Sequence, residues 1–316
     1  MEIENFKSIR SLKLGCKRIN LFIGEPNTGK TNILETIGLL SQVFYGNIRA
    51  FVRCENVADL FYDRVLDNSI KVAFDGKVLE VLSKGTTITG EYHIDRQQHS
   101  VFSYDYNFGG GSHMTMQDFS PFKFYRFAGR GVFPNRTPDF LHPPDGDNLL
   151  TILMSHKELK SLVRQIFERV GLMLVFEPSE SRMKVQEQVE DMIVAYPYSL
   201  ASDTLQRIVF HLASILSNRD SIITLEEPEA HAFPYYTKYL GETIALDRNQ
   251  NQYFISTHNP YLLLSIVEKA PKSDVAIFNT YLENHQTKTK ALTESQIEEV
   301  LGKGIDVFFD LERLIS

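Results

Sequence analysis

The chain has 316 residues, of which 43% are apolar and 23% charged, and this composition excludes a disordered chain, a collagen-like fibre and a small disulfide-stapled protein. The net charge of −7 argues against nucleic-acid binding over the whole surface, although a local basic strip stays open. Two cysteines, no run of 18 apolar residues and no apolar leader predict a reduced, cytoplasmic protein without a membrane span.

The first third of the chain predicts a β-hairpin, followed by a strand, a glycine-rich turn and a helix. The hairpin covers residues 1–14, and the short apolar run 19–23 reads as a buried strand. Apolar residues at helical spacing then follow from Thr31 to Leu40. Strand, turn and helix form the first organised unit of the chain.

The middle third is rich in predicted strands and ends in two predicted helices. The strands are expected at 70–74, 77–82, 86–94, 101–106, 122–127, 173–176, 183–189 and 191–195, and the helices at 148–155 and 157–170. Glycines 109–111 predict a flexible loop, because no helix follows them as a phosphate-binding turn would require. Prolines between 134 and 144 indicate a linker.

The last third alternates between helix and strand. Helices are expected at 203–216 and 234–247, strands at 221–225, 252–256 and 274–281, and a capping box at Thr293–Gln296 opens a final helix. Such alternation predicts a mostly parallel sheet covered by helices. We therefore expect one α/β domain over 1–316, with a β-rich edge and a helical lobe inserted at about 75–195.

Residues 24–31, GEPNTGKT, match the phosphate-binding pattern GxxxxGK[ST] between a predicted strand and a predicted helix. Backbone N–H groups of such a loop point at phosphate oxygens. The lysine is expected to reach the β- and γ-phosphates, and Thr31 to ligate Mg²⁺. An accidental glycine turn is disfavoured by this context. The residues expected to bind ATP here are Gly24, Glu25, Pro26, Asn27, Thr28, Gly29, Lys30, Thr31 and Asn32.

A second predicted strand ends in two carboxylates, Glu226 and Glu227, which suit the magnesium and the attacking water. Adjacent residues of a strand point to opposite faces, so the two carboxylates can have different roles. We expect Glu226 to hold Mg²⁺ through its water shell, and Glu227 to orient and deprotonate water. The alternative is a solvated acidic strand end.

Residues 226–229 (EEPE), followed by 256–260 (STHNP), resemble the Walker B and switch-histidine regions of ABC-type ATPases. The opening NFKS at 5–8 resembles the SMC/RecF/OLD-like class, often described as AAA-family ATP-binding proteins. The resemblance covers roughly 1–40 and 195–300. It implies a P-loop NTPase fold of ABC type, ATPase activity with ATP and Mg²⁺, and a catalytic His258 near the γ-phosphate.

ABC-type ATPases also carry a signature motif, for which residues 199–207 are the candidate. The glycine typical of that turn is absent. Ser202 would cap the following helix and leave an anion site for a γ-phosphate held by another subunit, whereas the charge of Asp203 would repel that phosphate unless it points away. An ordinary capped helix is the alternative. The glutamine of the family's Q-loop is not assigned among Gln42, Gln97 and Gln98.

The densest basic stretch contains Arg126, Arg130 and Arg136. A solvated loop is favoured over a nucleic-acid strip.

The resemblance implies a switch ATPase that dimerises on ATP, with nucleotide between Lys30 and Thr31 of one subunit and Ser202 of the other. It would regulate a separate partner or effector, in defence against phage or mobile DNA. The alternative is a DNA-engaging ATPase of recombination or repair. A monomeric P-loop kinase is disfavoured by the Glu226–Glu227 pair and His258. The chain ends soon after the last predicted helix, so the nuclease domain of OLD-type proteins is not expected within it.

Overall fold

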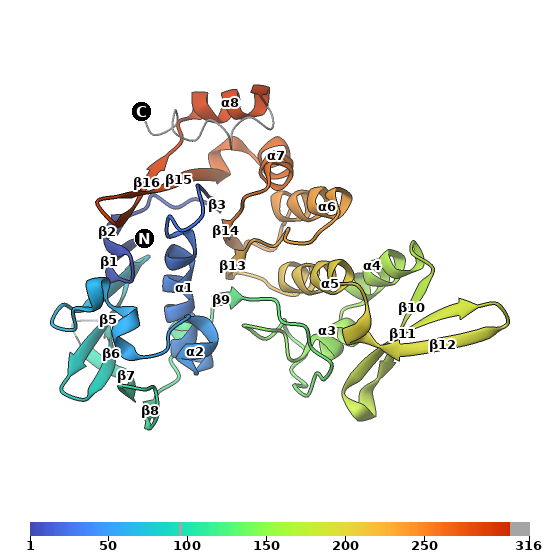
Figure 1. Cartoon of the computed structure of the whole chain (residues 1–316), viewed down its shortest axis with the longest axis horizontal. Coiled ribbons are helices and arrows are strands. Elements are labelled where there is room, and N and C mark those ends of the chain that lie inside the picture. Colours follow the sequence, from blue (N-terminus) through green and yellow to red (C-terminus); the bar gives the residue numbers. More distant parts are fainter. Residues whose placement is uncertain (95–96, 304–316) are drawn as a thin grey trace.

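The computed structural model describes residues 1–94 and 97–303, and a six-stranded sheet forms its core (Figure 1). The strand order is β16-β15-β3-β14-β13-β9, and all neighbours are parallel except the hairpin β15–β16. The strands are β3 (Ile19–Ile23), β9 (Phe122–Tyr125), β13 (Ile222–Glu226), β14 (Gln252–Ser256), β15 (Val275–Glu283) and β16 (Gln286–Ala291). The expected α/β fold with a mostly parallel core sheet is confirmed.

Helices cover both faces of this sheet, which explains why β3 is apolar along most of its length. On one face Ile19, Leu21 and Ile23 join a core built with α5, α6 and α7, and on the other Phe22 packs in the core of α1. Two-sided burial is typical of parallel sheets. The helices are α1 (Lys30–Tyr45), α5 (Asp203–Leu216), α6 (Pro234–Ala245) and α7 (Pro260–Lys269).

A seven-stranded antiparallel sheet packs on the other side of α1. Its order is β2-β1-β4-β5-β6-β7-β8, so the N-terminal hairpin β1–β2 belongs to this sheet through β4. The apolar side chains of Ile3 and Val72 from the sheet meet Ile33 of α1 in one core. The strands are β1 (Glu2–Phe6), β2 (Ile9–Lys13), β4 (Ile70–Phe74), β5 (Lys77–Lys84), β6 (Thr87–Ile94), β7 (Gln97–Asp105) and β8 (Gly111–His113).

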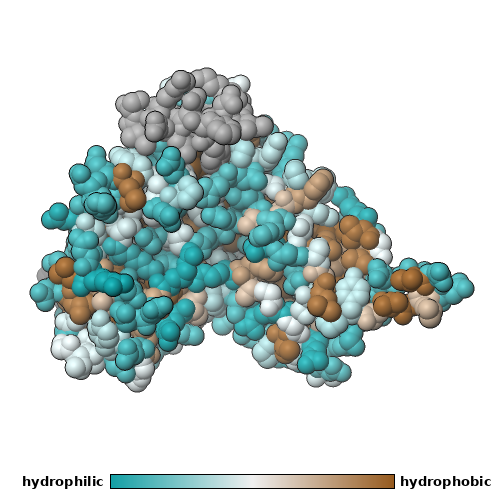
Figure 2. Space-filling model, viewed as in Figure 1, coloured by the Kyte–Doolittle hydropathy of each residue, from teal (hydrophilic) through white to brown (hydrophobic). Residues whose placement is uncertain are grey.

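The helical lobe carries a small sheet that projects from the body (Figure 1). It contains α3 (Leu149–Ser155), α4 (Lys157–Glu168) and the antiparallel strands β10 (Leu172–Glu177), β11 (Arg182–Val189) and β12 (Met192–Pro197), and it leads into α5. Figure 2 shows apolar side chains gathered on this arm, where Met192 and Ile193 are both exposed. The stretch 75–195, expected to be one insert, returns to the core sheet once, at β9.

Among the described residues, four α-helices and strands were not expected from the sequence: α2 (Ile48–Phe51), α7, β8 and β16. The start signals of α7 are present, because Pro260 follows Asn259, whose side chain accepts from two backbone N–H groups. In β16 only one of six residues, Thr287, is buried, so the strand has no apolar pattern. The loop expected at glycines 109–111 gives way to β8 at Gly111.

The predicted capping box at the final helix, α8 (Glu294–Lys303), is confirmed. The backbone N–H of Thr293 donates to Gln296 Oε1 at 2.9 Å, and the Gln296 N–H donates to Thr293 Oγ1 at 3.3 Å. Within the described residues, no helix combines the length and the apolar character that crossing a bilayer requires.

Candidate functional site

The phosphate-binding loop runs from the end of β3 to the start of α1, and its two glycines have backbone angles that disfavour other residues. Gly24 has φ +144° and Gly29 φ +96°. A Cβ atom on Gly29 would lie 1.9 Å from Thr287 Oγ1, and one on Gly24 would lie 2.1 Å from the Thr280 carbonyl oxygen. The curl of the loop is therefore packed against β15 and β16, and these glycines are required for it.

Lys30 lies across the inside of this loop. Its Nζ donates to the carbonyl oxygens of Gly24 at 2.9 Å and Glu25 at 2.6 Å, and the residue is buried. Burial lowers the pKa of Lys30 to about 8, against the opposing effect of Glu227 and Glu25. The lysine is thus placed where the loop would surround phosphate oxygens.

The pocket above the loop has a volume of about 790 Å³ and is lined by residues from seven separate stretches of the chain. Of the expected nucleotide-binding residues it brings together Pro26, Asn27, Thr28, Gly29, Lys30, Thr31 and Asn32, together with Glu226, Glu227 and His258. Gly24 and Glu25 face Lys30 through their carbonyl groups. Asn32 also donates to Ser8 Oγ at 2.6 Å, which ties α1 to the β1–β2 turn.

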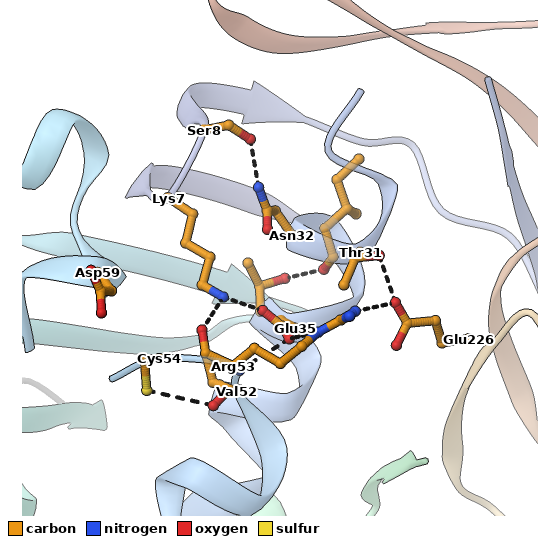
Figure 3. A network of polar contacts seen from close by, with 12 residues as sticks. Lys7, Ser8, Thr31, Asn32, Glu35, Val52, Arg53, Cys54, Asp59 and Glu226 are labelled. Atoms are coloured by element: carbon orange, nitrogen blue, oxygen red, sulfur yellow. Dashed lines mark hydrogen bonds and ion pairs between the residues drawn. The ribbon is translucent and has the colours of Figure 1, made fainter. Parts of the chain in front are cut away.

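Thr31 and Glu226 meet directly, as expected of two magnesium-binding residues. Thr31 Oγ1 donates to Glu226 Oε1 at 2.6 Å (Figure 3). The parallel order β3-β14-β13 brings the carboxyl ends of these strands to one edge, where ligands bind in such folds. A hydroxyl and a carboxylate oxygen fit Mg²⁺, which keeps several waters and takes its other ligands from phosphates. The described residues hold no group of three or more His, Cys, Asp or Glu side chains suited to a metal.

Glu227 follows the end of β13 and faces His258, which follows β14. Glu227 Oε1 lies 3.3 Å from His258 Nε2, and both side chains are partly exposed to the pocket. The backbone of Glu227 has φ +43°, unusual for a glutamate, and its N–H donates to the Ser256 carbonyl at 3.0 Å. Burial and the charge of Lys30 lower the pKa of His258, and they outweigh Glu227, which raises it. The lowered pKa favours the neutral imidazole ring.

Glu229 is a third glutamate of this segment, for which the motif suggested no role. It is buried, and its Oε1 accepts from Thr257 Oγ1 at 2.6 Å and from the His258 N–H at 3.3 Å. Oε2 is buried without a hydrogen-bond partner among the described residues. Burial raises the pKa of Glu229 to about 7. The side chain thus ties the segment after β13 to Thr257 and to the backbone of His258.

Glu229→Gln is expected to stabilise the protein at pH 8 relative to wild type, but not at pH 4.5. The folded protein holds the Glu229 proton up to about pH 7 and the unfolded chain releases it near pH 4.5, so stability is lost as the pH rises between these values. A neutral amide of the same shape removes that loss, worth about 1–3 kcal/mol. Urea unfolding of both proteins at the two pH values measures it, and an equal difference at both would contradict the assignment.

The basic stretch 126–136 does not form one solvated loop. Arg126 lines the pocket, where its Nη2 donates to Glu35 Oε1 at 3.1 Å. Arg130 pairs with Asp145, and Arg136 donates to Ser181 Oγ at 2.8 Å. The expectation of a solvated loop is therefore wrong for Arg126, because β9 ends at Tyr125 and turns the next residue into the site.

Besides Arg126, the lysine, arginine and glutamate residues of the pocket to which the sequence analysis gave no role in the site are Lys7, Glu35, Arg53 and Arg207. Lys7 lies in the NFKS segment and Glu35 lies one helical turn after Thr31. Their closeness to recognised motifs could therefore have indicated a place in the site. Arg53 and Arg207 come from a loop and a helix whose neighbours only the fold defines.

The candidate signature at the start of α5 is a capped helix. Ser202 Oγ accepts from the Leu205 N–H at 3.3 Å, which confirms the expected cap. Asp203 Oδ2 accepts from Arg207 Nε at 2.6 Å, so its charge is paired along the helix. Ser202 does not belong to the residues that line the pocket of its own chain. Thr204 Oγ1 donates to the His231 carbonyl at 2.6 Å, which links the signature helix to a pocket residue.

Residues 143–265 match the family model described as "AAA domain, putative AbiEii toxin, Type IV TA system". This segment contains helix α5 with the candidate signature, as well as Glu226, Glu227 and His258. No curated protein matches the chain in sequence.

Two solved structures of SMC head domains share the fold over nearly the whole chain. An SMC head bound to the C-winged helix domain of ScpA has a TM-score of 0.58 and 12% identity, over 94% of this chain and 98% of that chain. The SMC head with an extended coiled coil, bound to the C-terminal domain of ScpA from Pyrococcus furiosus, has a TM-score of 0.57 and 10% identity, over 96% and 98%. The chain therefore shares the fold of SMC head domains, in agreement with the P-loop fold of ABC type that its motifs predicted.

Proposed function

We propose that the chain binds ATP with Mg²⁺ and hydrolyses it, and that this cycle switches a dimer that regulates a separate effector. The observation that carries the proposal is the meeting of Lys30, the Thr31–Glu226 pair and the Glu227–His258 pair in one pocket. These groups come from the ends of three adjacent parallel strands and would surround a triphosphate and the water that attacks it.

Each group has a distinct role in this reaction. Lys30 and the loop N–H groups bind phosphate oxygens. Glu227 accepts the proton of the attacking water, and a neutral His258 at 3.3 Å holds that carboxylate in place. When bound, Mg²⁺ neutralises phosphate charge, and Thr31 and Glu226 would hold it.

The dimer is supported by the position of Ser202. The capped N-terminus of α5 is an anion-binding feature, yet Ser202 does not line the pocket of its own chain. A second copy could bring this helix to the nucleotide, and only the assembled site would then hold both ends of the triphosphate. Solved SMC heads that share the fold are bound to a separate protein, ScpA, and the matched family model names a toxin–antitoxin system. These descriptions support a separate effector and a role in defence against phage or mobile DNA.

ATP is expected to convert the Glu227→Gln protein from monomer to dimer, whereas ADP should not. Because this variant hydrolyses ATP slowly, the ATP-bound dimer should stay populated. Adding Ser202→Arg should block the dimer by filling the turn, while ATP still binds the isolated subunit. Ser295→Arg, at the exposed start of α8, is the matched control and should still dimerise. Light scattering with Mg²⁺ measures the mass, and an unchanged mass with ATP, ADP or no nucleotide would reject the composite site.

A further inference from the structure

Glu35 is a fully buried carboxylate that holds three cations from three separate segments. It lies on α1, one turn after Thr31, and its side chain has no exposed surface. Oε1 accepts from Arg53 Nε at 3.0 Å and Arg126 Nη2 at 3.1 Å, and Oε2 pairs with Lys7. A buried charge needs a partner, but one cation would neutralise it. Three cations leave an excess of positive charge beside the pocket.

The backbone of Arg53 is held by the same cluster. Its N–H donates to Glu35 Oε1 at 3.1 Å, and its carbonyl oxygen accepts from Lys7 Nζ at 2.6 Å. The inner part of the Arg53 side chain is thereby fixed, and its outer part reaches across the pocket to Glu226 (Figure 3). Glu35 therefore sets both the position and the direction of this guanidinium group.

Both guanidinium groups connect Glu35 to the metal-binding carboxylate. Arg53 Nη2 bonds to Glu226 Oε1, the oxygen that also accepts from Thr31, and Arg126 Nε lies 3.9 Å from Glu226 Oε2. A divalent cation that binds Glu226 must compete with Arg53 for this oxygen. Arg53 and Arg126 both line the pocket, and the planar set of donors of a guanidinium group matches a phosphate.

The charge of the pocket favours the binding of phosphate. Five lysine or arginine side chains line it against three glutamates, and four of these cations remain against the three glutamates once Arg207, paired with Asp203, is set aside, although the whole chain carries a net charge of −7. The cations are Lys7, Lys30, Arg53, Arg126 and Arg207, and the glutamates are Glu35, Glu226 and Glu227. A polyanion would neutralise this excess.

We propose, building on the function proposed above, that Glu35 is a positioning residue. It holds Arg53 and Arg126 as a pair that rests on Glu226 and moves onto the nucleotide phosphates when a divalent cation takes that carboxylate. Cation binding by Glu226 and phosphate binding by the arginines are then coupled through Glu35.

The first test measures the affinity for a non-hydrolysable ATP analogue with Mg²⁺ by calorimetry. Glu35→Gln should weaken binding about 10- to 100-fold, the range for losing charge-assisted hydrogen bonds. The same change should have little effect in an Arg53→Gln, Arg126→Gln background, because Glu35 acts through these two residues. Glu91→Gln is the matched control. It alters a buried glutamate of the outer sheet that pairs with Lys84, and should leave analogue binding unchanged.

The second test uses Arg53→Gln alone, whose side chain is 56% exposed and whose loss should not unfold the chain. This variant should weaken binding of the analogue. It should also bind Mn²⁺ more tightly in the ADP complex, measured by electron paramagnetic resonance, because Glu226 loses its competitor. A purely structural role of Arg53 would not move these two affinities in opposite directions.

The outcomes separate the two proposals. Wild-type protein that does not bind the analogue would reject the proposed function itself. Wild-type binding together with unchanged binding by Glu35→Gln would reject the role of Glu35 alone, as would equal effects of Glu35→Gln in both backgrounds. If Glu35→Gln does not fold, the measurements on Arg53→Gln test the proposal alone. Unchanged or weaker Mn²⁺ binding by that variant would reject the movement of Arg53 from Glu226 to the phosphates.

Discussion

Glu227→Gln is expected to bind ATP as wild type does and to hydrolyse it about 10² to 10⁴ times more slowly, the scale for removing a positioned general base. Glutamine keeps the length of the side chain and can still contact His258, which lies 3.3 Å from the carboxylate. It cannot accept a proton from water. Because Glu227 is half exposed and its contacts are few, the fold should be unaffected.

Single-turnover hydrolysis of labelled ATP measures this loss, and calorimetry measures binding separately. Glu268→Gln, an exposed glutamate of α7 outside the pocket, should hydrolyse ATP at the wild-type rate. If Glu227→Gln hydrolyses at that rate too, Glu227 is not the base, and Glu226 and His258 become the residues to test.

Lys30→Ala is expected to weaken ATP binding by at least about 100-fold, because it removes an ammonium group with several charge-assisted bonds to phosphate. Its present partners are two carbonyl oxygens and the Thr28 hydroxyl, all within the loop, so little packing is lost and the chain should stay folded. Circular dichroism checks the fold, and calorimetry the affinity. Retained affinity would show that the loop does not bind phosphate.

The same lysine predicts a pH dependence of binding in the wild-type protein. Burial lowers the pKa of Lys30 to about 8, and a bound triphosphate would favour the charged form. ATP affinity should therefore be constant below about pH 8 and fall about tenfold per pH unit above it, as proton uptake becomes part of binding. Affinity that stays constant to pH 9.5 would contradict this role.

The parts of the site that the sequence predicted are those built by local chemistry. The loop around Lys30 needs glycines at fixed positions and a strand and helix on either side, so its pattern lies within a dozen residues. Glu226 and Glu227 lie at the end of one buried strand, and His258 lies just after the end of another. The carboxyl ends of parallel strands lie at one edge of the sheet, so these residues were expected to be close together. Neither inference requires knowledge of how distant segments pack.

The parts that were missed depend on such packing. Arg53 enters the site only because Glu35 and Lys7 hold its backbone, and both contacts join segments distant in sequence. Arg126 enters the site because β9 forms the edge of the core sheet. The sequence of a strand of four residues does not indicate which sheet it will join. Strand β16 was missed because a polar edge strand lacks the alternation that marks a buried one.

The place of β3 in the core sheet has a consequence for synthesis on the ribosome. This strand is made among the first, yet it pairs with β14 on one side and β15 on the other, more than 200 residues later. The nascent chain therefore carries an unpaired apolar strand until β14 and β15 have emerged, since long-range pairing must wait for both partners. The proposed nucleotide site also needs the ends of β13 and β14, so ATP would stabilise only chains in which these strands have already joined the sheet.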